Sequence, residues 1–190
     1  MRPQLGKDKI LNAALQLFAK NGFHETSISQ IALAAAVSKG LMYNYFKSKE
    51  ELLLAIIDHA SEGMFEIAEN MAPNPAEAPQ SYQQVLDHFL RQFAAFLKTN
   101  EDYLSFQLSL LFQPKLKNLV QGPLQSRADH LLLTTEQMFH AAHIEHAAYT
   151  ARRFLAELDG ITLHYLSVFK DYPLDHMLKQ LFQNYKDLPK

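Results

Sequence analysis

The chain has 190 residues, 48% hydrophobic and 20% charged, which is ordinary for a globular protein with a buried core. It contains no cysteine, which excludes disulfides, thiol nucleophiles and cysteine-ligated zinc. The formal net charge is −2, but residues 1–50 carry a net +4 and the remainder carries −6. Such a basic head on an acidic body would orient the head towards a polyanion.

Composition also predicts the fold class. Glycine is scarce, at six residues, while alanine and leucine are abundant, which favours an all-α chain. The apolar periodicity indicates about nine helices, and no stretch alternates like a strand for long. No apolar run reaches the ~18 residues of a membrane span, and no signal peptide is recognisable, so we expect a cytoplasmic location.

The first predicted helix has one apolar face and a clear end. Asn21 and Gly22 stop the helix, because glycine suits the left-handed position after a helical C-terminus. The buried face is expected to consist of Ile10, Ala13, Ala14, Leu17 and Phe18.

Two short helices follow. Ser27 and Gln30 form a capping box at the start of a helix that ends near residue 35. Residues 34–37 form a tight turn, and Ser38 is the expected N-cap of a second helix over residues 39–46. Two short helices joined by a tight turn predict a helix-turn-helix, whose second helix enters the major groove of DNA.

The second short helix has chemistry suited to that role. Ser38 offers a hydroxyl at a positive helix end, Lys39 reaches a phosphate or a guanine edge, and Gly40 allows close backbone approach. Met42 and Phe46 are expected to point inward as core. The residues expected on the other side, together with the lysine at the start of the next helix, are Tyr43, Asn44, Tyr45 and Lys49.

A longer helix begins after a second S-x-x-E box and is expected to connect two domains over residues 48–71. Prolines at 73, 75 and 79 predict a linker over residues 72–80. We therefore expect a DNA-binding domain at 1–47 and a regulatory and dimerisation domain at 48–190. The further helices are predicted near 81–98, 101–112, 115–140, 145–169 and 173–187, with breaks or starts at Pro114, Gly122-Pro123 and Pro173.

Residues 8–55 resemble the tetracycline-repressor (TetR) family almost throughout the helix-turn-helix. The segments that carry the resemblance are Thr26-Ser27-Ile28, Ile31-Ala32, Ala35 to Gly40, and Tyr43 to Glu50. Two positions depart from the family pattern. Ala36 stands where glycine is frequent, which would strain the turn by roughly 1 kcal/mol if its φ is positive, and Leu41 stands where threonine or serine is frequent.

The resemblance implies a set of DNA contacts. Ser27 and Ser29 on the first helix would contact phosphates. The residues of the second helix that would face bases or flanking phosphates are Ser38, Lys39, Gly40, Asn44 and Tyr45. Tyr43 and Lys49 would anchor the DNA backbone. The alternative is that Ser27 and Ser48 only cap helices, and that Lys39, Tyr43 and Lys49 form an ordinary surface.

The resemblance also implies a ligand pocket and a dimer in the body. The expected pocket residues are Phe89, Gln92, Phe93, Phe96, Tyr103, Phe106, Gln107 and Leu110, unless this aromatic stripe is simple core. The last two helices would pair with those of a second subunit, and Gly160 would allow a close helix approach. The expected dimer residues are Leu158, Gly160, Ile161, His164, Leu178, Leu181, Phe182 and Tyr185.

No catalytic constellation stands out. The histidines at 140, 143 and 146 cluster near a helix junction, where their spacing spreads them around the chain, so we expect neither a metal site nor a cofactor. We expect a homodimeric, ligand-responsive transcriptional regulator that acts as a repressor. Its partners would be operator DNA and a small apolar or amphipathic effector that releases it from that DNA. The alternatives are a helical-bundle enzyme or an adaptor that has lost DNA binding.

Overall fold

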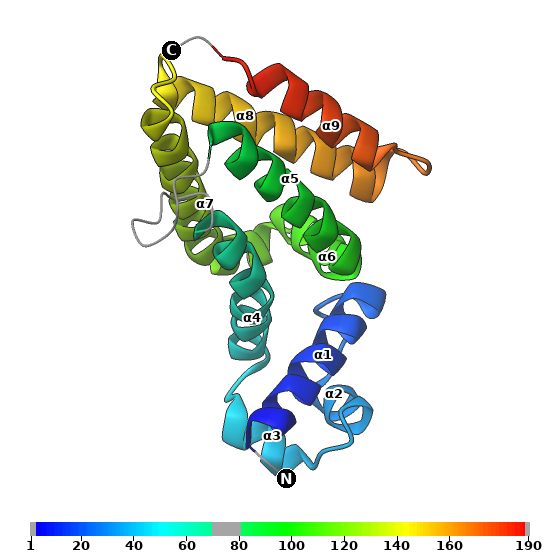
Figure 1. Ribbon diagram of the computed structural model, residues 1–190. Helices are drawn as coiled ribbons and strands as arrows, with labels where there is room; N and C mark the ends of the chain where they lie inside the picture. The colour runs from blue at the N-terminus through cyan, green and yellow to red at the C-terminus, as the bar shows by residue number, and fades with distance from the viewer. Residues whose placement is uncertain (1–2, 70–80, 189–190) are drawn as a thin grey trace. The chain divides into compact units, whose positions relative to one another are not determined.

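The computed structural model describes residues 3–69 and 81–188, and within them the chain is all-α, as predicted (Figure 1). In this part of the chain, nine α-helices and one short π-helical segment follow one another in the order expected from the sequence. Their bounds are α1 Pro3–Asn21, α2 Ile28–Ala34, α3 Lys39–Tyr45, α4 Lys49–Glu69, α5 Tyr82–Thr99, α6 Glu101–Leu111, α7 Pro114–Ala141, α8 Ala147–Leu163, η1 His164–Val168 and α9 Leu174–Tyr185.

The chain forms two compact units that differ from the predicted domains. The head unit comprises Met1–Ser61 and Asp102–Pro123, and the body unit comprises Glu62–Glu101 and Leu124–Lys190. The sequence placed a boundary at residue 47, but the unit that holds the helix-turn-helix also holds most of α6 and the first turns of α7.

The core of the head unit is built on α1. Ile10, Ala14 and Phe18 are buried, and Phe23 packs its ring 5.1 Å from that of Phe18. Gly22 has φ +90° and its N–H donates to the Phe18 carbonyl at 3.0 Å, so the predicted left-handed helix end is confirmed.

The turn between α2 and α3 stores strain at one residue. Ala36 has φ +54°, the left-handed region in which a Cβ is unfavourable by about 1 kcal/mol. The turn is held by the N–H of Val37, which donates to the Ala32 carbonyl at 2.9 Å. The sequence predicted strain at Ala36 if its φ is positive, and that condition is met.

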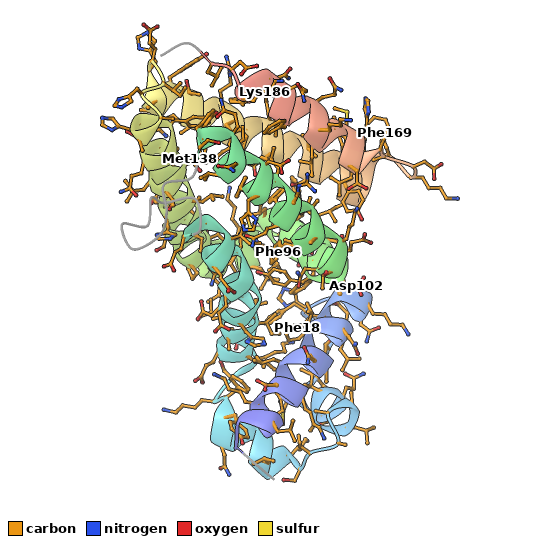
Figure 2. The ribbon with its side chains drawn as sticks, in the orientation of Figure 1. Phe18, Phe96, Asp102, Met138, Phe169 and Lys186 are labelled. Carbon is orange, nitrogen blue, oxygen red and sulfur yellow. The ribbon has the colours of Figure 1, made fainter. Side chains whose placement is uncertain are left out.

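Helix α6 belongs to the head unit through two contacts. The centre of the Phe106 ring lies 6.0 Å from that of Phe18 on α1, and the two rings are stacked; Phe18 is labelled in Figure 2. The buried Tyr103 hydroxyl donates to the Ile57 carbonyl on α4 at 3.5 Å. Helix α6 is therefore attached to both α1 and α4.

The body unit is organised around an aromatic core. Helix α5 lies alongside α8 and α9 (Figure 1). Phe154 on α8 packs against Phe89, Phe139 and Tyr185, with ring centroids 5.0–5.9 Å apart. The Tyr82 hydroxyl adds a hydrogen bond of 2.7 Å to the Tyr185 carbonyl, which joins the start of α5 to the end of α9.

Two predicted helix boundaries differ from the structure. Helix α7 continues through Pro123, although Gly122 and Pro123 were expected to mark a break or a start; the boundary between the two units falls directly after this proline. The helix predicted over 145–169 begins at Ala147 and changes to π-helical turns at His164. Val168 and Phe169 are exposed where α8 leads to α9, and Phe169 is labelled in Figure 2.

The predicted linker at 72–80 and the end of the connecting helix lie outside the described residues. Within residues 3–69 and 81–188, no helix is both long and apolar enough to cross a membrane.

Candidate nucleic-acid interface

Helix α3 has a buried side and an exposed side. Met42 and Phe46 are buried, as predicted, and hold the helix against the head unit. Lys39, Asn44 and Tyr43 are exposed, and the Tyr43 side chain is 53% accessible. Helix α3 therefore presents a cation, an amide and a phenol from one short rod, a set able to bind phosphates and base edges.

Both short helices are capped by serines. The Ser27 hydroxyl accepts from the Gln30 N–H at 3.2 Å, while the Gln30 side chain accepts from the Ser27 N–H at 2.7 Å, so the predicted capping box is confirmed. The Ser38 hydroxyl accepts from the Leu41 N–H at 3.1 Å. Capping uses these hydroxyls as acceptors, so each exposed serine still has a proton to donate to a phosphate. Ser29 is also exposed on α2.

Gly40 is not required by packing within the chain. A Cβ built on it meets only the Ser38 hydroxyl oxygen, at 3.9 Å. The absence of a side chain leaves the exposed backbone at the start of α3 open to close approach from outside.

Tyr45 is only half-buried and lies against α1 rather than on the open side of α3. A Cβ added to Gly6 would come within 3.1 Å of the Tyr45 hydroxyl oxygen, so the tyrosine occupies the space that this glycine leaves. Tyr45 thus contacts the head unit's own first helix, and its assignment as a base contact stays a prediction.

Lys49 lies at the first position of α4, but its ammonium group is already occupied. It donates to the carbonyls of Phe23 at 2.7 Å, Thr26 at 3.0 Å and His24 at 3.3 Å. The nitrogen also lies 4.4 Å from the centre of the Phe23 ring. An ammonium has three N–H donors, and here all three have a partner within the loop between α1 and α2. The family resemblance implied a DNA contact for Lys49, and no local sequence pattern indicates this contact with the loop.

The loop that Lys49 contacts has a second tie. Thr26 is buried, and its hydroxyl lies 2.8 Å from the Gly22 carbonyl and 3.2 Å from that of Leu17. Sequence analysis missed this residue as well, because a threonine one position before an N-cap serine has no distinctive pattern.

The residues expected to line a ligand pocket divide between the two units. Phe89, Gln92, Phe93 and Phe96 belong to the body unit, whereas Tyr103, Phe106, Gln107 and Leu110 belong to the head unit. Of these eight, the buried ones are Phe89, Phe93, Tyr103, Phe106 and Leu110.

Most residues expected at a dimer interface are buried within the chain itself. Helices α5, α8 and α9 pack together and cover the apolar stripes that the sequence assigned to a partner, and the residues concerned are Leu158, Ile161, Leu178, Leu181 and Tyr185. Gly160, His164 and Phe182 keep accessible surface. A stripe of apolar residues indicates that something covers it, but not which molecule does.

The histidine cluster does not form a metal site. His143 and His146 adopt positive φ values, +59° and +53°, in the turn between α7 and α8. Among the described residues, no group of three or more histidine, aspartate or glutamate side chains could hold a metal ion.

Comparison with known proteins identifies the segment that carries α1 to α3. Residues 10–56 match the family model described as bacterial regulatory proteins, tetR family. The chain is 32% identical over 138 residues to the uncharacterized HTH-type transcriptional regulator YuxN of Bacillus subtilis, a match that covers 65% of this chain and 43% of YuxN. The segment that holds α2 and α3 is therefore similar to tetR-family regulators.

Another curated relative matches a shorter part of the chain. The fatty acid metabolism regulator protein of Bacillus subtilis is 33% identical over 82 residues, covering 43% of this chain and 42% of that protein. The chain thus spans less than half the length of these two curated relatives. A transcriptional regulator from Aquifex aeolicus has the same fold, with a TM-score of 0.73 at 23% identity, covering 95% of this chain and 98% of that one.

Proposed function

We propose that the chain is a transcriptional regulator that binds operator DNA through the exposed side of α3. The observation that carries the proposal is that Lys39, Tyr43 and Asn44 are exposed on a helix whose opposite side is fixed by Met42. A rigidly seated helix with free polar side chains suits the major groove. The tetR-family match over residues 10–56 includes this helix.

The proposed regulator acts as a homodimer. Two α3 helices one helical turn of DNA apart, about 34–36 Å, would contact successive major grooves. Support on the chain itself comes from Gly160, where an added Cβ meets nothing within 4 Å in the described residues, and from accessible Phe182 on the neighbouring helix. A second subunit would use the space at Gly160 for a close helix approach.

We further propose that a small apolar or amphipathic effector releases the DNA. In the body unit, Phe89 and Phe93 stack with centroids 5.9 Å apart, and the side-chain oxygen of Gln92 between them in sequence is buried without a hydrogen-bond partner in the described residues. Apolar walls with sparse polar groups suit such a ligand. A relative named as a fatty acid metabolism regulator supports an acyl chain as the first ligand to try.

The proposed route of release runs through α6. Its Phe106 contacts Phe18 on α1, and its Tyr103 contacts the Ile57 carbonyl on α4. An effector with different affinities for two positions of α6 would change the populations of two positions of the helix-turn-helix.

A gel shift tests the DNA-binding proposal. A duplex is first selected from a random pool by the wild-type protein, and its affinity is then measured for Lys39→Ala, Tyr43→Phe and Lys179→Ala. Lys179 is exposed on α9, so it is a control for the lost charge. We expect Lys39→Ala to bind about tenfold more weakly and Lys179→Ala to bind as wild type. Undiminished binding by both α3 variants would refute the proposed surface.

Oleate is the probe for the effector proposal. Addition of oleate is expected to release the duplex from the wild-type protein. In the absence of DNA, oleate is expected to raise the Tm of the protein. Gln92→Leu is expected to change the oleate concentration that is needed to release the duplex. Wild-type DNA binding that is indifferent to oleate would refute an acyl ligand while leaving the DNA-binding proposal intact.

A further inference from the structure

The start of α4 carries a charge of the unfavourable sign. Lys49 is the first residue of the helix, where unpaired backbone N–H groups create a positive end that favours anions. Glu50 and Glu51 follow it and suit this position, and Glu51 accepts from the Lys47 N–H at 2.7 Å. A lysine here needs compensation from another group.

Three carbonyl oxygens supply that compensation. The Phe23, His24 and Thr26 carbonyls converge on the Lys49 nitrogen at 2.7, 3.3 and 3.0 Å. Phe23 is 2% exposed and places its ring face beneath the same nitrogen. The site is a cage of three dipoles and one aromatic ring around a compact cation, and it uses every donor that the cation has.

The cage joins segments that are far apart in the sequence. The three carbonyls belong to the loop that leads into α2, 23 to 26 residues before Lys49. The Thr26 hydroxyl fixes the same loop to the end of α1. The position of the α2 N-terminus is thereby tied both to α1 and to the first turn of α4.

We propose that Lys49 is a positioning residue of the helix-turn-helix, which holds α2 and α3 against α4 and makes no contact with a DNA phosphate. The inference rests on the proposed DNA-binding function for its effect on affinity, but not for its effect on stability. Lys49 therefore acts on DNA binding through the loop at residues 23–26.

Salt dependence separates a positioning lysine from a phosphate contact. The affinity falls with salt, and each phosphate contact that is lost reduces the steepness of log K against log salt by about 0.9. We expect Lys49→Met to bind the selected duplex more weakly with an unchanged slope. Lys39→Ala is expected to reduce both the affinity and the slope, and it serves as the positive control.

The charge-conserving variant provides a second readout. A guanidinium substitutes well for an ammonium on a phosphate, but its planar fork cannot aim three donors at three carbonyls from one point. We expect Lys49→Arg to keep the weakened binding of Lys49→Met. Recovery of wild-type affinity in Lys49→Arg would overturn the proposal. This variant also keeps the charge if Lys49→Met fails to fold.

Thermal unfolding tests the cage without DNA. Removing the cation leaves three carbonyls without a donor, so Lys49→Met is expected to lower the Tm by at least about 3 °C. Lys47→Met removes an exposed lysine two residues away and is expected to leave the Tm unchanged. Equal Tm values for the two variants would overturn the proposal, as would a salt slope in Lys49→Met that falls as far as in Lys39→Ala. If the wild-type protein binds no duplex, the proposed function fails, and the Tm comparison alone decides the role of Lys49.

Discussion

Helices α3 and α9 both have a regular apolar side. The sequence predicted correctly what covers that side on α3, but not on α9. On α3, Met42 and Phe46 are buried as expected, and the polar side stays open. On α9, Leu178 and Leu181 were expected to face a partner subunit, yet they are buried among helices of the same chain. Periodicity identifies the side of a helix that will be covered, whereas the identity of the cover depends on tertiary packing.

The difference should be largest in the effect of side-chain truncation on α9. Leu181 is 2% exposed, so Leu181→Ala is expected to lower the free energy of unfolding by about 2–5 kcal/mol, at every protein concentration. Urea denaturation measures this loss. The neighbouring Phe182→Ala removes a partly accessible side chain and should cost less in the monomer.

A concentration series sharpens the same comparison. If Leu181 contacts a partner, the stability of Leu181→Ala will approach that of wild type as the protein is diluted and both become monomeric. If it is core, the difference between the two proteins will persist on dilution. The first outcome would contradict the placement of α9 in the core of its own chain.

The next largest effect is expected at the loop before α2. Thr26→Val keeps the shape of the side chain but removes the hydroxyl that bonds to the Gly22 and Leu17 carbonyls, so it should cost about 1–2 kcal/mol by urea denaturation. Thr99→Val is the control, because Thr99 is exposed and its hydroxyl bonds to the Ala95 carbonyl within its own helix, α5. A smaller cost at Thr26 than at Thr99 would contradict its role in the loop.

A smaller change of opposite sign is expected in the turn between α2 and α3. Ala36→Gly relieves the strain of φ +54° and should stabilise the protein by about 0.5–1 kcal/mol. Ala35, with φ −75°, is the matched control. Ala35→Gly should destabilise, because it loses a buried methyl group and gains only freedom in the unfolded chain. A loss of stability at both positions would show that the turn is unstrained.

The last prediction concerns the pH dependence of stability, which is expected to have no effect at neutral pH. Burial raises the pKa of Tyr185 to about 12; its hydrogen bond to Glu157 acts in the same direction and that from Arg153 opposes it. At high pH the Tyr185 hydroxyl therefore keeps its proton in the folded state after it has lost it in the unfolded state. The stability that Tyr185 contributes is intact below about pH 10 and is lost as the pH rises towards 12.

Denaturation at about pH 9, 10 and 11, a range that spans the ordinary tyrosine pKa, measures this dependence. The decline above pH 10 should be weaker in Tyr185→Phe than in wild type. Tyr149→Phe, at a side chain 68% exposed on α8, is expected to decline as wild type does. An identical decline in all three proteins would contradict the role of Tyr185.

Local chemistry made the helix-turn-helix predictable. The capping box at Ser27, the N-cap at Ser38 and the left-handed Gly22 each depend on residues within four positions, so the sequence contains the information in full. The Lys49 cage depends on a loop 23 or more residues away, and the attachment of α6 to α1 depends on Phe18 and Phe106. Contacts of that range follow from the folded arrangement and not from any local pattern.

Photocrosslinking tests the central claim, that the exposed side of α3 meets DNA, most directly. The chain has no cysteine, so Asn44→Cys and Ala156→Cys each provide one attachment point for an aryl azide, on α3 and on an exposed position of α8. At saturating protein, the label at residue 44 should crosslink to the selected duplex and the label at residue 156 should not. Crosslinking from residue 156 alone, or from both positions equally, would contradict the account.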